Sequence, residues 1–361
     1  MISPVLRNRS MPLLALLAAG LFSLSSQETP GRAGQTAVEA RFGAETASTG
    51  NTEILRETPV MRERLFPSIY FLARVEEHAA REEARPYWAP TEEERRALDE
   101  RFRPNESLLL NNDILAFYGH PNSTRMGILG RYSLEDLDAR LSRLAREYEE
   151  AGGRPVKKAL YLIYGTVWPE GEIGILNEAI LLRYIEYALA HDALVFIDHQ
   201  IGRYDPVASL RRMLPYLRYP NVHLALDPEW RTTKPMQEIG SVTAAEINEA
   251  QRVMEAYMVE NGIPGERLLV IHQFNWAMIR NREEVRSNFE RVRLVHCADG
   301  FGNPSLKRQS YAFNAQARNI PVKAFKLFYN FEIPGAGYDS PLLSPREVYN
   351  LSPRPYIIMY Q

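Results

Sequence analysis

Four carboxylic acids stand where apolar runs of this chain end, and these residues are the ones best suited to chemistry. Asp198 and Asp227 end two successive runs, Glu229 follows Asp227 by two positions, and Asp299 ends a later run. Carboxylates that are held close together raise the pKa of at least one of them, which can leave an acid beside a carboxylate at neutral pH. Glycoside hydrolysis uses such a pair: one group protonates the leaving oxygen, and the other attacks the sugar or activates water. We therefore expect Glu229 to be the general acid/base and Asp198 or Asp227 the nucleophile or water-activating base.

Aromatic, amide and imidazole side chains near the same run ends predict a sugar-binding surface. Aromatic faces stack on the apolar faces of sugar rings, and amide and imidazole groups hydrogen-bond to hydroxyl groups. We expect Asp299, His272 and Gln273 to orient the substrate. The full set of predicted substrate-binding residues is Tyr118, Tyr164, Trp168, Gln200, Trp230, His272, Gln273, Trp276, Asp299, Tyr329 and Asn330.

One lysine interrupts an apolar run. Lys326 lies on the same side of its run as Asn330. A lysine in such a run needs either a carboxylate partner at the site or an outer face on which it reaches solvent. Both arrangements fit the sequence.

The elements that position these residues form an eight-fold alternation of strand and helix. The expected strands are residues 113–118, 158–164, 193–198, 222–227, 268–273, 293–299, 324–330 and 355–360. Their nearly continuous apolar content is typical of a parallel sheet covered on both faces, and eight such units in about 250 residues predict an α/β fold of the (β/α)₈ TIM-barrel type. Active sites of these barrels lie at the C-terminal ends of the strands.

Alternation along a strand predicts which side chains face the barrel axis. On the fourth strand, Leu224 and Leu226 suit the face against the helices, which sends Asp227 and Glu229 toward the axis or the mouth. If the strand continued through both acids, their Cα atoms would lie about 6.5 Å apart.

The helices between the strands carry their own start and stop signals. We expect them at residues 134–151, 175–191, 207–216, 244–261 and 276–286, with weaker ones at 305–317 and 345–349. Ser133 and Thr243 stand at the N-cap positions of two of them, and Thr243 is followed three residues later by Glu246, the capping-box arrangement. A doubly wound open sheet is the alternative architecture, but no glycine-rich phosphate loop follows the first strand.

The N-terminal quarter of the chain differs in composition from the rest. Basic residues precede an apolar stretch, which predicts a signal peptide over residues 1–26 and a secreted, periplasmic or cell-envelope protein. An uncleaved signal that anchors the chain in a membrane is the alternative. Residues 27–58 predict a flexible tether, residues 59–112 a charged helical extension, and residues 113–361 the catalytic barrel.

Charge and cysteine content exclude several classes of partner. The formal net charge is −2, which gives no electrostatic reason to expect nucleic acid or an anionic membrane surface as a ligand. The single cysteine, Cys297, allows no internal disulfide and no cysteine-based zinc site, and its apolar run predicts a buried thiol. We expect no cofactor and a polysaccharide or oligosaccharide as the partner.

Several segments resemble a group of largely uncharacterised secreted bacterial proteins with glycoside-hydrolase-like TIM barrels. The resemblance covers about residues 112–361 and is carried by the segments AFYG with MGILG at 116–119 and 126–130, FIDHQIGR at 196–203, LDPEW at 226–230 and DGFG at 299–302. It implies the barrel fold and export. Chitinase-like barrels carry a spaced acidic series that leads to a glutamate on the fourth strand, whereas this chain has only Asp227 and Glu229 there.

Two other functions use the same residues. A divalent-metal hydrolase of the phosphodiesterase type could bind its ion through the carboxylates with His272 as one imidazole ligand, although the paired-histidine motif of many such barrels is missing. A non-catalytic protein that binds glycans or the cell envelope could keep the barrel as a scaffold, because barrels host many functions.

Overall fold

The computed structural model describes residues 108–361. The predicted signal peptide and tether lie outside the described residues, and so does all of the predicted helical extension except its last residues, where α5 spans Leu108–Asn111. Among residues 108–361, no helix is both long and apolar enough to cross a membrane.

Eight parallel strands close into a barrel, so the predicted (β/α)₈ fold is confirmed. Around the ring the strands follow the order β1, β2, β4, β5, β7, β9, β10 and β11, and β11 pairs with β1. Closure rules out the open doubly wound sheet. The strands span Asp113–Gly119 (β1), Val156–Val167 (β2), Leu194–Gln200 (β4), Val222–Asp227 (β5), Arg267–Gln273 (β7), Val292–Ala298 (β9), Val322–Leu327 (β10) and Ile357–Tyr360 (β11).

The seventh barrel strand is shorter than expected, and several short elements lie between the barrel strands and helices of the described residues. β10 ends at Leu327, so Tyr329 and Asn330 belong to the loop that follows it. A short strand, β3 at Ile173–Ile175, pairs antiparallel with the end of β2. Six 3₁₀ turns lie at Leu129–Arg131 (η1), Pro169–Gly171 (η2), Leu214–Arg218 (η3), Pro228–Trp230 (η4), Trp276–Met278 (η5) and Arg282–Glu284 (η6).

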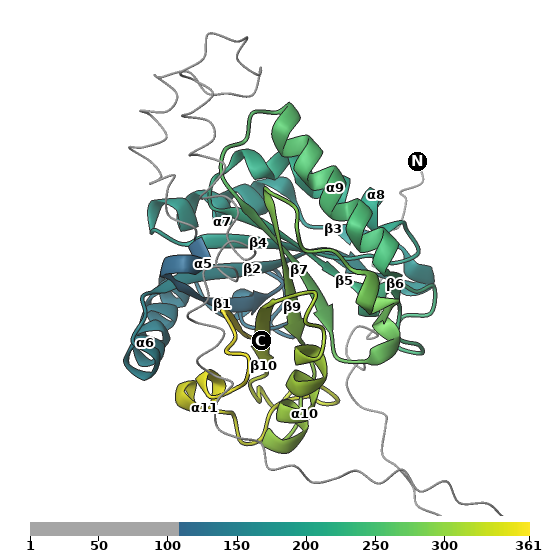
Figure 1. Ribbon diagram of the computed structural model, residues 1–361. Helices are drawn as coiled ribbons and strands as arrows, with labels where there is room; N and C mark the ends of the chain where they lie inside the picture. The colour runs from purple at the N-terminus through teal and green to yellow at the C-terminus, as the bar shows by residue number, and fades with distance from the viewer. Residues whose placement is uncertain (1–107) are drawn as a thin grey trace, which may run out of the picture.

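Helices lie on the outside of the ring of strands (Figure 1). They span Leu134–Gly152 (α6), Glu178–Ala190 (α7), Pro206–Met213 (α8), Ala244–Glu260 (α9), Pro304–Ala315 (α10) and Pro345–Tyr349 (α11). The expected caps are present: the Ser133 side chain accepts a hydrogen bond from the backbone of Asp136, and Thr243 forms a capping box with Glu246. Each cap satisfies backbone N–H groups that the first helical turn leaves without a partner.

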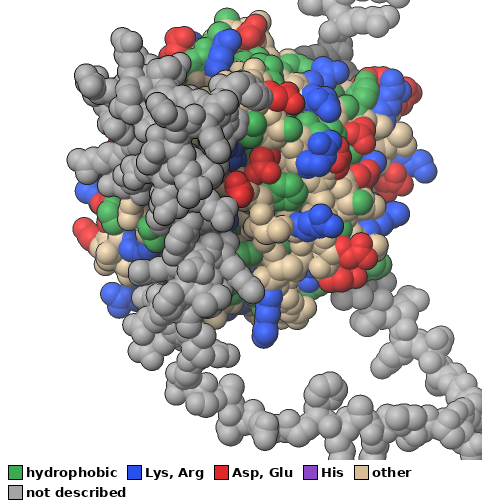
Figure 2. All heavy atoms as spheres, turned by 45° about the horizontal axis from the view of Figure 1, so that its top comes forward, with side chains coloured by type: hydrophobic (Ala, Val, Ile, Leu, Met, Phe, Trp, Pro, Cys, Tyr) green, Lys and Arg blue, Asp and Glu red, His purple; other side chains and the backbone are tan. Residues whose placement is uncertain are grey.

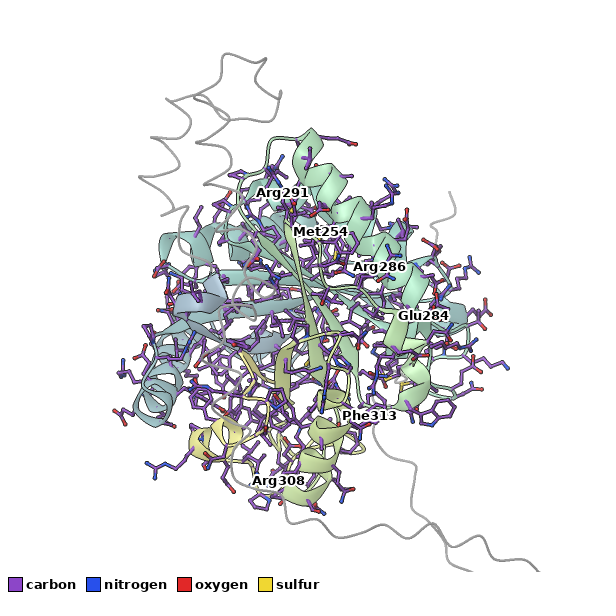
Figure 3. All side chains as sticks on the ribbon, viewed as in Figure 1. Met254, Glu284, Arg286, Arg291, Arg308 and Phe313 are labelled. Carbon is purple, nitrogen blue, oxygen red and sulfur yellow. The ribbon has the colours of Figure 1, made fainter. Side chains whose placement is uncertain are left out.

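The helix expected at residues 276–286 is wrong. This stretch contains η5, the short strand β8 at Ile279–Arg280 and η6, and β8 pairs with β6 at Val242–Thr243. Asn281, between β8 and η6, takes a left-handed conformation with φ of 54°, which an α-helix does not accommodate. The segment is fastened to α9 instead, because Asn248 donates to the carbonyl of Glu284 and accepts from the N–H of Arg286 (Figure 3).

Side-chain alternation along the strands produces two separate apolar cores. The larger one lies between the barrel and the helices, and Met254 of α9 is among its residues (Figure 3). The smaller one fills the barrel interior, with Phe196 and Ala225 among its members. Residues two positions beyond these interior side chains, Asp198 and Asp227, therefore face the axis at the C-terminal ends of their strands.

The outer surface carries charges of both signs. On the face shown in Figure 2, acidic and basic side chains are interspersed among small apolar patches. The formal charge of −2 reflects nearly equal numbers of basic and acidic residues, 43 and 45, rather than a lack of charged residues.

Candidate active site

Acidic side chains from neighbouring elements converge at the C-terminal mouth of the barrel. Asp198 is 0% exposed, Asp227 is 2% exposed, and Glu229 is partly buried. The charges of Asp227 and Asp299 both raise the pKa of Glu229, so these carboxyl groups lie within one small volume. The expected convergence of the acids is present.

The local geometry that brings Glu229 there differs from the expected continuous strand. β5 ends at Asp227, and Pro228 starts the 3₁₀ turn η4. Asp227 caps this turn, because its Oδ1 accepts a hydrogen bond from the backbone N–H of Glu229 at 3.2 Å. A proline at the first position of a turn has no N–H to leave unpaired, which suits this abrupt end of the strand. The strand-based spacing of 6.5 Å therefore does not apply to this pair.

Two tyrosines from adjacent strands bind the innermost polar groups. Tyr118 of β1 donates its hydroxyl hydrogen to Oδ2 of Asp198 at 2.9 Å, and the Tyr161 hydroxyl of β2 lies 2.9 Å from Nε2 of His272. Oδ1 of Asp198 is buried and has no hydrogen-bond partner among the described residues. A buried carboxylate oxygen without a partner is costly, which makes this atom a candidate acceptor for a ligand hydroxyl.

His272, Asp299 and Lys326 continue the network from β7 to β10. Nδ1 of His272 lies 2.9 Å from Oδ2 of Asp299, and Nζ of Lys326 lies 3.1 Å from Oδ1 of the same carboxylate. Nε2 of His272 lies 3.7 Å from Oδ2 of Asp198. Of the two arrangements that the sequence left open for Lys326, the structure has the carboxylate partner at the mouth.

Burial and mutual repulsion raise the pKa values of the three catalytic candidates. Desolvation raises the pKa of Asp227 to about 7, against the attraction of the nearby His272. Desolvation, followed by the charge of Asp227, raises the pKa of Glu229 well above its usual range. Desolvation also raises the pKa of Asp198, although His272, Lys326 and the Tyr118 hydrogen bond act in the opposite direction. At neutral pH the site therefore holds protons that ordinary carboxyl groups lose.

Beside these acids, the surroundings of Asp299 and His272 favour the charged forms of both groups. Burial alone would raise the pKa of Asp299, but Lys326 and His272 outweigh it and lower that pKa to about 2. Burial would lower the pKa of His272, and the charges of Asp198 and Asp299 reverse this and raise it well above its usual range. The site thus combines an ionised Asp299, a protonated imidazole and a protonated Lys326 with proton-retaining acids.

Tyr161 is a member of the network that the sequence analysis missed. It packs face to face with Phe196 and edge-on against His272 in the barrel interior. The signal was available, because Tyr161 lies two positions after Ala159 and two before Ile163 on the inward side of β2. Its apolar neighbours in the sequence are those of an ordinary core residue.

Two predicted substrate-binding residues lie on the outer face of the barrel. Tyr164 packs against Tyr216 and His199 in the core beneath the helices. Gln273 is buried, and its Oε1 accepts a hydrogen bond from Arg282 at 3.1 Å. The same oxygen lies 2.8 Å from Nε2 of His296. Each follows an inward-facing residue by one position, and a one-residue step turns the side chain to the opposite face. The structure therefore does not bring these two side chains together with the acids.

The remaining predicted residues line the rim or brace it. Gln200 is buried, and its Oε1 accepts from the backbone N–H of Val167 at 2.8 Å, which ties the ends of β4 and β2 together. Trp168 is 43% exposed and Trp276 is 75% exposed. The five predicted residues on loops or turns after the strands are Trp168, Trp230, Trp276, Tyr329 and Asn330.

The metal-dependent alternative places its ion on the carboxylates and His272, not on Cys297. Cys297 is buried in the barrel interior, as expected, and burial raises the pKa of its thiol. Within residues 108–361, no group of three or more His, Cys, Asp or Glu side chains is arranged to hold a metal ion. His272 already faces Asp299 at one ring nitrogen and Tyr161 at the other.

Comparisons with known proteins gave likeness of structure alone. No protein-family model and no curated protein sequence matches the chain. Among solved structures, a GH18 chitinase from the chitin utilization locus of Flavobacterium johnsoniae is similar over 69% of this chain and 87% of its own, with 8% identity and a TM-score of 0.37. A GH5-4 broad specificity endoglucanase from Clostridium cellulovorans is similar over 70% of this chain and 85% of its own, with 10% identity and a TM-score of 0.38. At these values neither likeness carries an inference about activity.

Proposed function

We propose that the protein is a secreted hydrolase that cleaves glycosidic bonds of a cell-wall or environmental polysaccharide. The observation that carries this proposal is the pairing of Asp227 with Glu229, whose pKa values are both raised at the mouth of a closed barrel. Export rests on the signal-like N-terminal sequence, with Arg7 and Arg9 ahead of an apolar stretch.

Glu229 is the general acid of the proposed reaction. It is the most exposed of the three catalytic candidates, and its raised pKa keeps its proton at neutral pH. Among the described residues, no side chain donates a hydrogen bond to its carboxyl group. The proton is therefore available to the glycosidic oxygen, which leaves as an alcohol when the bond to the anomeric carbon breaks.

Asp227 is the base or nucleophile of the same reaction. A pKa of about 7 is close to the operating pH, where a group is a strong enough base to accept a proton and about half of it is still ionised. Its Oδ1 is held by the N–H of Glu229, which fixes the orientation of the carboxylate relative to the acid. Asp227 either takes a proton from the attacking water or bonds directly to the anomeric carbon.

The deeper groups supply fixed charge and orientation. Asp198 accepts from Tyr118 through Oδ2 and keeps Oδ1 for a substrate hydroxyl. His272 and Lys326 place positive charge beside Asp227, which limits the rise of its pKa, whereas Asp299 acts in the opposite direction. The two ring nitrogens of His272 already face Asp299 and Tyr161, and this arrangement favours acid/base hydrolysis over the metal-dependent alternative.

Incubation with a panel of polysaccharides and chromatography of the products tests the proposal. Each glycan is incubated with and without a chelator, and we expect cleavage in both. Glu229→Gln and Asp227→Asn should each reduce the rate about 10²- to 10⁴-fold, whereas Glu150→Gln, an exposed change on α6, should leave it unaltered. Full activity in both site variants, or activity that chelation abolishes, would reject it.

A further inference from the structure

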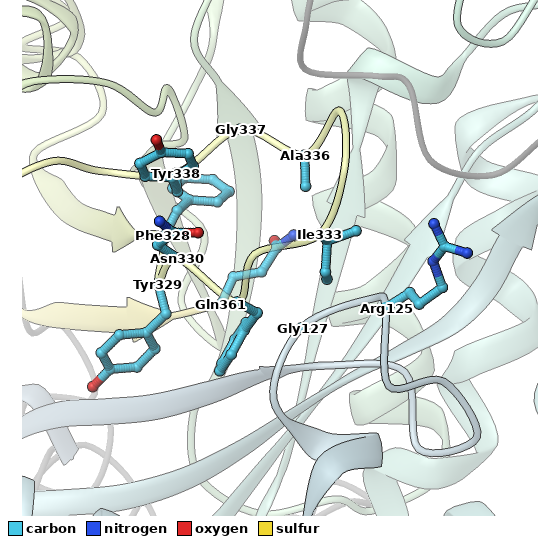
Figure 4. Close-up of a pocket in the computed structure, with 11 residues that line it drawn as sticks. Arg125, Gly127, Phe328, Tyr329, Asn330, Ile333, Ala336, Gly337, Tyr338 and Gln361 are labelled. Carbon is cyan, nitrogen blue, oxygen red and sulfur yellow. The ribbon is translucent and has the colours of Figure 1, made fainter.

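A small pocket opens at the mouth of the barrel between the loops that follow β1 and β10 (Figure 4). Arg125 and Gly127 come from the first loop, and Asn330 and Tyr338 come from the second. Gln361, directly after β11, lines the pocket between them. The volume is about 40 Å³.

The pocket adjoins the candidate active site through shared walls. Phe328 lines the pocket, and its ring lies 5.1 Å from Nζ of Lys326. Gly127, on the opposite wall, has φ of 82° and packs so closely on Tyr118 that a Cβ there would collide with the Tyr118 carbonyl oxygen. Tyr118 is the residue that donates to Asp198. Phe328 and the backbone of Tyr118 therefore lie between the pocket and the buried network that contains Lys326 and Asp198.

The loop after β10 is held in place by a buried acid. Asp339 accepts hydrogen bonds from the N–H groups of Phe328 and Gly302, each at 3.0 Å, and lies 3.3 Å from Nζ of Lys307. The N–H of Tyr329 donates to the carbonyl of Gln361 at 2.8 Å. This wall of the pocket is thus formed before any ligand arrives.

Arg125 is the charged side chain among the residues that line the pocket. None of its lining residues has an acidic side chain. Arg125 has no carboxylate partner among the described residues, and the nearby Arg131 lies 3.8 Å above the ring of Phe331 and donates through Nε to the carbonyl of Gly127. Glu332 belongs to the same loop but is exposed and does not line the pocket.

The volume indicates the size of the group that fits. A cavity needs about 10–15 Å³ on this measure to hold one water molecule. The pocket is about three times larger, which matches the three heavy atoms of a carboxylate and is too small for a whole hexose ring. The ring would lie outside, against exposed Tyr338.

We propose that this pocket binds the carboxylate of an acidic sugar residue, and that the substrate is a polysaccharide containing uronic acid. The identification of the ligand as a sugar rests on the proposed function. Arg125 pairs with the carboxylate, since a planar guanidinium matches the two oxygens, and the side-chain amide of Gln361 lines the pocket between Arg125 and Asn330 (Figure 4).

Ligand-observed NMR titration of the full chain with glucuronic acid, glucose and glucose 6-sulfate tests this site. We expect glucuronic acid to bind most tightly. Arg125→Gln should weaken that binding about tenfold or more, in line with a charge-assisted hydrogen bond, and leave glucose unaffected. Arg143→Gln, the same change at an exposed position of α6, should alter neither. Equal binding of the three sugars, tighter binding of the sulfate, or no effect of Arg125→Gln would overturn the proposal.

The same titration in Glu229→Gln separates this site from the proposed reaction. Because Glu229 does not line the pocket, glucuronic acid should bind this variant as it binds the unaltered chain. If no glycan is cleaved while Arg125-dependent binding persists, the hydrolase proposal fails and the carboxylate site stands. If neutral glycans are cleaved and glucuronic acid gains nothing from Arg125, the site fails and the hydrolase stands.

Discussion

The buried imidazole of His272 is bound through Nδ1 to Oδ2 of Asp299 at 2.9 Å, with the side chains 0% and 5% exposed. This single contact links the two sides of the barrel mouth, because His272 also faces Asp198 and Asp299 also pairs with Lys326. Removing water from charged groups is expensive, and opposite charges in contact offset that cost only when each has its partner. The consequence is a charged cluster in which every member depends on the others.

Asp299→Asn should therefore destabilise the fold and change the protonation of its neighbour. We expect a loss of about 3–5 kcal/mol in the free energy of unfolding at pH 7, since Lys326 is left buried without its carboxylate. The pKa of His272 should fall, which NMR of the imidazole nitrogens measures directly. Glu347→Gln is the matched control, because its pair with Arg308 is exposed and should contribute less than about 1 kcal/mol.

The same contact predicts how stability depends on acid. The pKa of Asp299 is lowered to about 2 in the folded chain, against about 3.9 for an unfolded aspartate. Its stabilising contribution is thus fully present above pH of about 4 and is lost as the pH falls through about 2. Urea unfolding curves measured at several pH values should show that Asp299→Asn loses less unfolding free energy than the unaltered chain between pH of about 4 and about 2. An identical decrease in both proteins would contradict the lowered pKa of Asp299.

The rate of glycan hydrolysis should follow a bell-shaped dependence on pH. The acid side reports Asp227, which must lose its proton to act and has a pKa of about 7. The alkaline side reports Glu229, whose pKa is raised well above its usual range and which must keep its proton. The two groups interact, so the apparent pKa values obtained from the pH dependence of kcat/KM belong to the pair. A rising limb centred near pH 4 would show that Asp227 is not desolvated as described.

Asp227→Asn should inactivate the protein yet stabilise it at alkaline pH. A carboxyl group with a pKa raised from about 3.9 to about 7 destabilises the folded chain once the pH exceeds the unfolded value, by up to about 4 kcal/mol when both states are ionised. The amide keeps the oxygen that accepts from the N–H of Glu229. Thermal unfolding should show a higher Tm than the unaltered chain at pH 9 and no difference at pH 4. A variant that is less stable at both pH values would contradict this.

Strand order and closure followed from the sequence because each barrel strand is a short apolar run bounded by polar residues. The helices with clear caps, such as α6 after Ser133 and α9 after Thr243, were also predicted within a few residues. Residues 276–286 have the apolar content of a helix, but the left-handed Asn281 and the pairing of β8 with β6 depend on contacts that sequence periodicity does not record.

The acids of the site were predictable and their surroundings were less so. Asp198, Asp227 and Asp299 end apolar runs, and parity along the fourth strand gave the direction of Asp227. Parity also determines the outward direction of Tyr164 and Gln273, which chemical type alone had placed at the mouth. Parity also gives the inward direction of Tyr161, but its contact with His272, 111 residues away in the sequence, is not recorded in the local pattern.

Trp276 should affect binding of a polymeric substrate without affecting the fold. Its side chain is 75% exposed in η5, directly after β7, so Trp276→Ala should change the free energy of unfolding by less than about 0.5 kcal/mol. Stacking of an aromatic face contributes about 0.5–1.5 kcal/mol, which predicts a rise in KM of about two- to tenfold with kcat unchanged. Leu189→Ala is the control, because Leu189 is 45% exposed near the end of α7 that leads into β4, at the opposite end of the barrel. An equal effect of both variants on KM, or none of Trp276→Ala, would remove this tryptophan from the predicted binding surface.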